Sequence, residues 1–396
     1  MTVQSYNTCD QIISMKFQLL LGSLLSQIKI RHWWLGILLW LVLVAPAQAA
    51  VILRVAIERG VNQVKVGSNT TAIVKDSGGR TLGNLPGMSA FYAQAVPGGV
   101  ALDKWQSGLF WIEPTGKEGL VYIGDRWYRG RTLVVPTDKG LDVVNWVDLE
   151  EYLYSVIGGE MSSNWPQEAL KAQAIAARTY ALYKREQQRK NPVYDLGDTP
   201  DRWQIYKGVS SESPAVYSAV DATAGQVLTY NNNLILSVFH ACSGGHTENV
   251  EDVWGNPLPY LRAVQDYDQN IKECSWERNF TPAEISARIS GVGNVKDVIP
   301  EAFSPFRSVK ALRIVGDKGT KVIKGEDVRT ALRLRSTRFN VIRREDGSFV
   351  LQGLGFGHGL GMSQWGAYNL ALRGANHLQI LGHYYRGVAL TPIKAK

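Results

Sequence analysis

Cysteine is scarce in this sequence, and the motifs that depend on metal-binding residues are missing. The chain has 3 Cys among 396 residues, with no C-x-x-C pair and no H-E-x-x-H segment. It also lacks a dense run of Lys and Arg, and its net charge of +8 comes from 43 basic and 35 acidic residues. This mild surplus suits an anionic surface, whereas a nucleic-acid-binding stretch would concentrate its charge. Neither a zincin nor a nucleic-acid-binding protein is indicated.

A glycine-rich segment at 355–366 fails two further motif tests. A dinucleotide-binding loop starting at Gly355 would need Gly or Ala where Leu360 stands. A serine-hydrolase elbow around Ser363 would need Gly where Trp365 stands. The sequence therefore excludes the nucleotide-binding and serine-hydrolase interpretations.

The first fifty residues have the features of a secretory signal. A 13-residue apolar run at 33–45 follows Lys29 and Arg31 and precedes Ala47-Gln48-Ala49. A basic flank, a short apolar run and an A-x-A site are typical of a signal peptide, and the run is short for a membrane-spanning helix. We expect residues 1–49 to direct export to the periplasm or cell wall. The alternative is an uncleaved anchor, which would be the only membrane contact.

The two cysteines beyond the signal form a candidate disulfide. Cys9 lies within the signal, which leaves Cys242 and Cys274 in the exported part. An isolated pair in an oxidising compartment suits a disulfide. The sequence does not show whether their Cα atoms come close enough, so bridged and free forms both remain open.

The order of strand and helix patterns predicts an α+β fold. Short alternating segments separated by Gly, Asn and Asp turns fill residues 51–145, and two helices are expected at 148–159 and 164–190. Later strands and helices do not alternate strictly, which argues against a doubly wound sheet. We predict a β-rich N-terminal region at 50–125 and a mixed α+β body at 126–390, in which the two helices form a hairpin.

Glu160 is the strongest candidate for chemistry. It follows Gly158-Gly159 in the connection between the two predicted helices and precedes the apolar residues Met161 and Trp165. Apolar neighbours raise the pKa of a carboxyl group, as a general acid requires. The alternative is an ordinary polar residue in a turn.

Long motifs surround Glu160 and continue towards the C-terminus. In chain order they are YRG at 128–130, VVNWVDLEEYL at 143–153, Glu160-Met161, Trp165-Pro166, EALKAQAIAARTYAL at 168–182, QIYKG at 204–208, SGGHTENVEDVWG at 243–255, PYLRAV at 259–264, GEDVRTALRLRSTRF at 325–339, GFGHGLGMSQWGAYNLA at 355–371 and ILGHYYRG at 380–387. In this order they resemble the SpoIID/LytB family of sporulation and cell-wall proteins over roughly 125–390.

The resemblance implies a lytic transglycosylase that cleaves peptidoglycan glycan strands, preferably strands without stem peptides. Glu160 would protonate the glycosidic oxygen between N-acetylmuramic acid and N-acetylglucosamine. It would then accept the proton of the muramyl C6 hydroxyl, which closes a 1,6-anhydro ring. The substrate supplies its own nucleophile, so neither a cofactor nor the second carboxylate of ordinary glycosidases is needed.

Six further positions are implied as substrate-binding residues, and each has a structural alternative. They are Arg178, Tyr260, Arg262, His358, Ser363 and Gln364. Arg178 would otherwise be a structural arginine, and the last three would otherwise serve turns or helix caps. His240 and His246 are left open between polar contacts and core positions.

One departure from the family concerns zinc. Some members bind zinc through a Cys-x4-His-Cys-Gln stretch before the Q-x-Y motif, where this chain has Gly197, Arg202 and Trp203. None of these side chains is a zinc ligand, so no metal is predicted. A weaker alternative cluster consists of His240, Cys242 and His246.

Two other functions compete with the transglycosylase. The first is a non-catalytic wall-binding enhancer of an N-acetylmuramoyl-L-alanine amidase, for which a carboxyl group at Glu160 has no evident use. The second is a hydrolytic muramidase, which needs another carboxylate near Glu160. The nearest in sequence are Glu150, Glu151 and Glu168, whose expected helix-surface positions make them poor candidates.

Overall fold

The computed structural model describes residues 50–200, 202–269 and 271–393. The predicted signal at 1–49, with Cys9, lies outside the described residues. Within the described part of the chain, no helix combines the length and apolar character that crossing a membrane requires.

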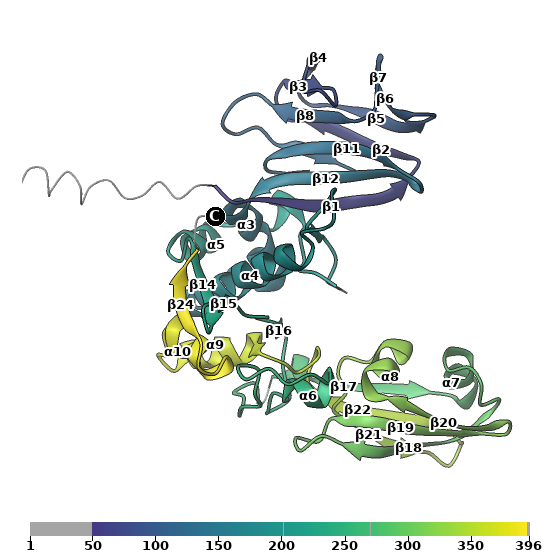
Figure 1. Cartoon of the computed structure of the whole chain (residues 1–396). Helices are drawn as coiled ribbons and strands as arrows, with labels where there is room; N and C mark the ends of the chain where they lie inside the picture. The colour runs from purple at the N-terminus through teal and green to yellow at the C-terminus, as the bar shows by residue number, and fades with distance from the viewer. Residues whose placement is uncertain (1–49, 201, 270, 394–396) are drawn as a thin grey trace, which may run out of the picture. The chain divides into compact units, whose positions relative to one another are not determined.

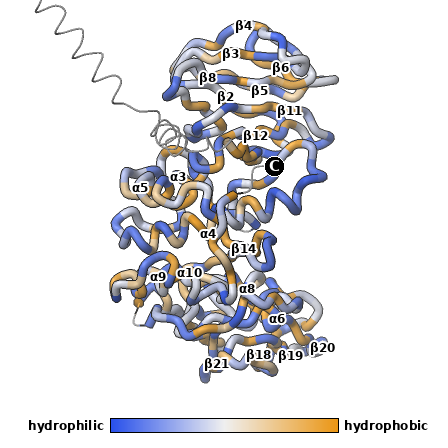
Figure 2. The backbone as a smooth tube through the Cα atoms, turned by 60° about the vertical axis from the view of Figure 1, so that its left-hand side comes forward, coloured by the Kyte–Doolittle hydropathy of each residue, from blue (hydrophilic) through white to orange (hydrophobic). Residues whose placement is uncertain are grey.

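The described chain begins with two antiparallel sheets that share one core. The first has the strand order β13-β1-β12-β11-β8-β3-β4 and the second β10-β9-β2-β5-β6-β7 (Figure 1). The exception to the antiparallel pairing is the short strand β13, which runs parallel to β1. Hydrophobic and hydrophilic residues alternate along these strands (Figure 2), and the buried ones from both sheets form a single cluster. The strands are β1 (Ile52–Val61), β2 (Gln63–Ser68), β3 (Ala72–Lys75), β4 (Thr81–Leu85), β5 (Ser89–Val96), β6 (Gly99–Leu102), β7 (Trp105–Ser107), β8 (Phe110–Pro114), β9 (Val121–Ile123), β10 (Arg126–Tyr128), β11 (Arg131–Thr137), β12 (Gly140–Asp148) and β13 (Leu196–Gly197).

The long strand β12 leads directly into the helical hairpin. It pairs with β1 from Ile52↔Asp148 onwards, so the β-rich part extends to Asp148. The side chain of Asp148 then caps α3 (Leu149–Glu160) by accepting a hydrogen bond from the backbone N–H of Glu150. The predicted β-rich front and α+β class are confirmed.

The second helix of the hairpin, α4 (Gln167–Gln187), is buried around most of its circumference. Nearly every residue from 169 to 182 is buried, and six of these are alanines. Small side chains let several elements approach the helix backbone closely. A helix that is buried on most sides has to be covered by other elements in this way. α4 is packed against α3, which precedes it in the sequence, and against α9 and α10, which lie near the C-terminus.

Most of the remaining elements of the body form a second core around α4, while α5 packs into the first core. β16 and β23 pair in parallel, which brings the start of α9 beside the segment before Cys242. The elements are η2 (Gly208–Ser211), α5 (Pro214–Asp221), β14 (Gln226–Tyr230), β15 (Asn233–Leu234), β16 (Phe239–His240), α6 (Val250–Val253), β23 (Met362–Ser363), α9 (Gln364–Leu372), α10 (His377–Tyr384) and β24 (Ala389–Pro392).

Between α6 and β23 the chain forms a segment with its own core. Two three-stranded antiparallel sheets, β17-β22-β21 and β18-β19-β20, share a buried cluster with two helices. The elements are η3 (Lys272–Cys274), β17 (Ser275–Phe280), α7 (Pro282–Arg288), β18 (Val295–Phe303), β19 (Val309–Gly316), β20 (Gly319–Lys324), α8 (Gly325–Leu332), β21 (Phe339–Arg343) and β22 (Phe349–Leu354).

A disulfide joins this segment to the body. Cys242 and Cys274 are bonded, with Cα atoms 5.9 Å apart. The returning chain also pairs with Cys242, because the Phe356 N–H donates to the Cys242 carbonyl at 2.7 Å. Both ends of the segment are therefore fixed at one residue of the body.

Replacing both cysteines with Ser is expected to lower the free energy of unfolding by about 3 to 4 kcal/mol. The bond closes a loop with a sequence separation of 32, and the lost loop-closure entropy of the unfolded chain sets that magnitude. Urea unfolding of the wild type and the double variant measures it. An unchanged midpoint after full reduction of the wild type would contradict this role.

Candidate active site

Glu160 is the last residue of α3, and the chain packs closely against that last turn. A Cβ atom on Gly158 would lie 1.8 Å from the carbonyl oxygen of Ser211, and one on Gly159 would lie 3.0 Å from the Cγ2 atom of Ile205. The sequence predicted that the glycine pair ends the helix. That was wrong, because the helix continues through both glycines to Glu160 and they serve close packing instead.

The QIYKG segment approaches Glu160 in an alternating pattern. Gln204 and Tyr206 are buried, and Tyr206 donates to Asn145 of β12 at 2.7 Å. The residues between and after them, Ile205 and Lys207, remain accessible. Anchoring every second residue in the core holds the intervening backbone against the end of α3.

Two hydrogen-bond donors hold the carboxyl group of Glu160. The Ile205 N–H donates to Oε1 at 3.0 Å, and the Gln364 Nε2 donates to Oε2 at 3.2 Å. Gln364 is the first residue of α9, 204 positions away in the sequence. The carboxyl group is therefore fixed from two separate parts of the fold.

Burial raises the pKa of Glu160 above its usual value, against the opposing effects of these two donors and of the Lys207 charge. The position at the C-terminal end of α3 acts in the same direction as burial, because the free helix carbonyls disfavour negative charge. A carboxyl group in this environment keeps its proton to higher pH, as a general acid needs.

Three aromatic rings form a cluster beside the residues that hold Glu160. The ring centroid of Trp165 lies 4.6 Å from that of Trp365 and 5.0 Å from that of Tyr368. All three side chains are only partly buried, and such surfaces stack well on sugar rings. Trp365 and Tyr368 were not among the predicted site residues, although Trp365 directly follows Gln364 and Tyr368 lies one helical turn further on in the same GMSQWGAY motif.

Comparison with known proteins decides the family. A model described as stage II sporulation protein (SpoIID) matches residues 137–230, which include Glu160. The chain is 34% identical over 267 residues to the stage II sporulation protein D of Bacillus subtilis (strain 168), covering 63% of this chain and 76% of that protein. The chain belongs to the SpoIID family. This confirms the resemblance seen in the sequence and indicates a cell-wall-related function.

Two further relatives and a second model extend the comparison of this SpoIID-family chain. An uncharacterized protein of Brachyspira hyodysenteriae is 34% identical over 284 residues, covering 69% of this chain and 76% of that protein. The amidase enhancer of Bacillus subtilis is 30% identical over 297 residues, covering 60% of this chain but 40% of that protein. A domain of unknown function (DUF8618) matches residues 275–361, the segment with its own core.

Of the six substrate-binding positions that the SpoIID resemblance implied, Gln364 alone is hydrogen-bonded to Glu160. Ser363 is fully buried and caps α9, where its hydroxyl accepts from the Gly366 N–H at 3.1 Å. His358 accepts from the Leu360 N–H at 3.0 Å within the glycine-rich turn. Ser363 and His358 thus have the cap and turn roles that were the stated alternatives.

Arg178 is a structural residue. Its side chain is 0% exposed, and its guanidinium contacts the Glu150 carboxylate, with Nε 2.9 Å from Oε1. It also donates to the backbone carbonyls of Val220 and Gln226. The structure does not support the implied sugar-binding role, because no part of the guanidinium reaches solvent.

Tyr260 and Arg262 are also engaged within the fold. Tyr260 is 7% exposed, and its hydroxyl accepts from the Leu236 N–H at 3.2 Å. Arg262 is more accessible and pairs with Glu251 at 2.7 Å. A stacking role for Tyr260 is not supported, because its ring belongs to the second core; Arg262 keeps a partly exposed guanidinium.

His240 and His246, whose roles the sequence left open, both lie in packed surroundings. His240 is buried, and its Nδ1–H donates to the Leu360 carbonyl at 3.0 Å. Burial lowers the pKa of His240 to about 4. The ring of His246 stacks on Phe306 with centroids 5.2 Å apart. A neutral His240 suits a core position.

The residues at the zinc position of other SpoIID-family members do not fit a metal ion. A Cβ atom on Gly197 would lie 2.7 Å from the indole ring of Trp203, so the tryptophan fills the space beside the glycine. Among the described residues, the one group of potential ligands comprises Cys242, Cys274 and Asp268. The two sulfur atoms are joined in the disulfide and offer no thiolate.

Replacing Glu160 with Gln is expected to stabilise the fold at neutral pH. Because its pKa is raised in the folded state, the folded protein holds the proton more tightly than the unfolded chain. Wild-type stability therefore falls as the pH rises from the unfolded value near 4.5 through the folded pKa, whereas the variant loses nothing there. Thermal unfolding should show a higher Tm for the variant at neutral pH and equal Tm values below 4.5. A lower Tm at neutral pH would contradict the desolvation of this carboxyl group.

Proposed function

We propose that this protein is an exported peptidoglycan lytic transglycosylase with Glu160 as its one acid and base. It cleaves the bond between N-acetylmuramic acid and N-acetylglucosamine in glycan strands and leaves a 1,6-anhydro-muramyl end. The observation that carries the proposal is the environment of Glu160. Its carboxyl group has a raised pKa and is held by two donors, and no carboxylate of the described residues is among the groups that shift this pKa.

The proposed reaction uses one carboxyl group twice. Protonated Glu160 donates its proton to the glycosidic oxygen while the bond from that oxygen to the muramyl C1 breaks. The muramyl C6 hydroxyl attacks C1, and the Glu160 carboxylate accepts the hydroxyl proton. Glu160 ends in its starting protonation state, and no water is consumed. The donors from Ile205 and Gln364 stabilise the carboxylate between the two transfers.

The neighbouring carboxylates favour this reaction over hydrolysis, which needs a second acid close to the first. Glu150 is bound to Arg178 and to the Gly225 N–H at 3.0 Å. Glu168 is bound to Lys171 and His377, and these partners outweigh burial and lower its pKa to about 2. Glu151 is half-buried on α3 and is not hydrogen-bonded to Glu160 in the described chain.

The second candidate function is a wall-binding enhancer of an amidase, and one relative favours it by its name. Under that function the chain would bind glycan strands or an amidase without cleaving strands. The environment of Glu160 favours the enzyme, because a pure binding module gains nothing from a partly desolvated carboxyl group.

Mass spectrometry of digested glycan strands tests the proposal. The chain without its predicted signal is incubated with strands stripped of stem peptides, and we expect products ending in 1,6-anhydro-muramic acid. Products with ordinary reducing ends would replace the proposal with hydrolysis. Intact strands that remain bound to the protein would favour the enhancer.

A further inference from the structure

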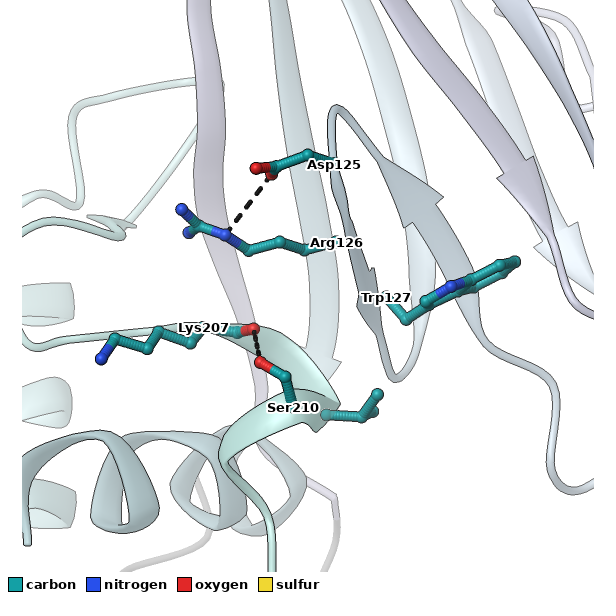
Figure 3. Close-up of a pocket in the computed structure, with 6 residues that line it drawn as sticks. Asp125, Arg126, Trp127, Lys207 and Ser210 are labelled. Atoms are coloured by element: carbon teal, nitrogen blue, oxygen red, sulfur yellow. Dashed lines mark hydrogen bonds and ion pairs between the residues drawn. The ribbon is translucent and has the colours of Figure 1, made fainter.

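A small pocket lies where the β9–β10 hairpin meets the end of the QIYKG segment. Its volume is about 240 Å³. It is lined by Asp125, Arg126, Trp127, Lys207, Val209 and Ser210 (Figure 3). The hairpin belongs to the β-rich front, and the other wall belongs to the segment that holds Glu160.

Glycine makes the junction of these two walls possible. Gly208 has φ +67°, and a Cβ atom there would lie 2.0 Å from the carbonyl oxygen of Trp127. The neighbouring Lys207 N–H donates to the hydroxyl of Ser155 on α3 at 3.1 Å. Lys207 is thus fixed by its backbone two residues beyond Ile205, whose N–H binds Glu160.

The two cations of the pocket differ in their partners. Arg126 lies 3.4 Å from Asp125 and 3.8 Å from Asp198, so its charge is largely matched. Lys207 is exposed and makes no ion pair within the part of the chain that the structure describes. In Figure 3 both side chains extend to the same side of the hairpin, while Trp127 points to the other.

An unpaired cation close to the acid and base can bind an anionic group of the substrate. Each muramic acid carries a lactyl group. In a strand with stem peptides this group forms an uncharged amide bond with the peptide. Once the peptide is removed, the group becomes a free carboxylate, which is the anion that a lysine ammonium can pair with.

We infer that Lys207, with Arg126 beside it, binds the free lactyl carboxylate of a muramic acid residue near the cleaved bond. This inference rests on the proposed function and assigns to these residues the discrimination between stripped strands and strands that carry peptides. Lys207 supplies the charge and the direct contact, and Arg126, whose own charge is largely matched by Asp125 and Asp198, lines the pocket beside it.

Binding measured in the Glu160→Gln protein tests the inference without cleavage. The probes are stripped strands and the same strands with their lactyl carboxylates converted to amides. Lys207→Gln should weaken binding of the carboxylate strands by about 5-fold and leave binding of the amide strands unchanged. Lys207→Arg should retain the preference for carboxylate strands. The matched control is Lys139→Gln. Lys139 is exposed in the turn before β12, whereas α3 follows the other end of that strand, so this substitution should change neither affinity.

The possible outcomes separate this inference from the proposed function. Equal losses on both probes, or no loss on either, would overturn the role of Lys207. If the wild type then still forms anhydro ends, the proposed function survives alone. If the wild type cleaves nothing but Lys207→Gln removes the preference for carboxylate strands, the binding site stands and the catalytic proposal fails.

Discussion

Replacing Glu160 with Gln should reduce the rate of strand cleavage by about 10²- to 10⁴-fold, the range that a positioned general acid and base contributes. Gln has nearly the same shape and can still accept from the Ile205 N–H, but it carries no transferable proton. The rate is measured as the release of anhydro-muramyl products from stripped strands. Circular dichroism and the Tm verify that the variant is folded.

A matched carboxylate on the same helix provides the control. Glu151 is half-buried on α3, and burial raises its pKa as it does for Glu160. Glu151→Gln should therefore leave the cleavage rate close to that of the wild type. Undiminished cleavage by Glu160→Gln, or an equal loss in both variants, would remove Glu160 from the catalytic role.

Replacing Arg178 with Met should lower the free energy of unfolding by about 3 kcal/mol, the lower end of the range for breaking a buried ion pair from one side, because Arg178 is fully buried but the Glu150 side chain is 24% exposed. The substitution leaves the Glu150 carboxylate without its main partner and frees the carbonyls of Val220 and Gln226. Urea unfolding measures the change.

An exposed Arg–Glu pair serves as the comparison for Arg178. Arg262 and Glu251 are both about one-third exposed, so Arg262→Met should cost at most about 1 kcal/mol. If Arg178→Met were as stable as the wild type and lost strand binding instead, Arg178 would contact substrate after all and the structural role would be wrong.

The local patterns of the sequence predicted the fold class and the two helices of the hairpin. Alternating segments indicated a β-rich front, and the spacing of apolar residues indicated α3, which ends at Glu160, and α4, which follows it. These predictions succeed because each depends on residues that are neighbours in the sequence.

The features that the sequence did not reveal depend on distant contacts. Gly158-Gly159 looked like a helix end, since nothing in the sequence shows that Ser211 and Ile205 pack there. Arg178 looked like a ligand for sugars, because its partner Glu150 lies on another helix. Gln364 was selected through family resemblance alone, and its contact with Glu160 arises from the parallel pairing of β16 with β23.

A digest in water enriched in oxygen-18 distinguishes ring closure by the C6 hydroxyl from attack by water. We expect the new muramyl ends to contain no oxygen from water, because the C6 hydroxyl of the same sugar closes the ring. Mass spectrometry of the products should therefore show the same anhydro ends in enriched and ordinary water. Heavy oxygen at the new reducing ends would show that water is the nucleophile, and the single-carboxylate mechanism would be wrong.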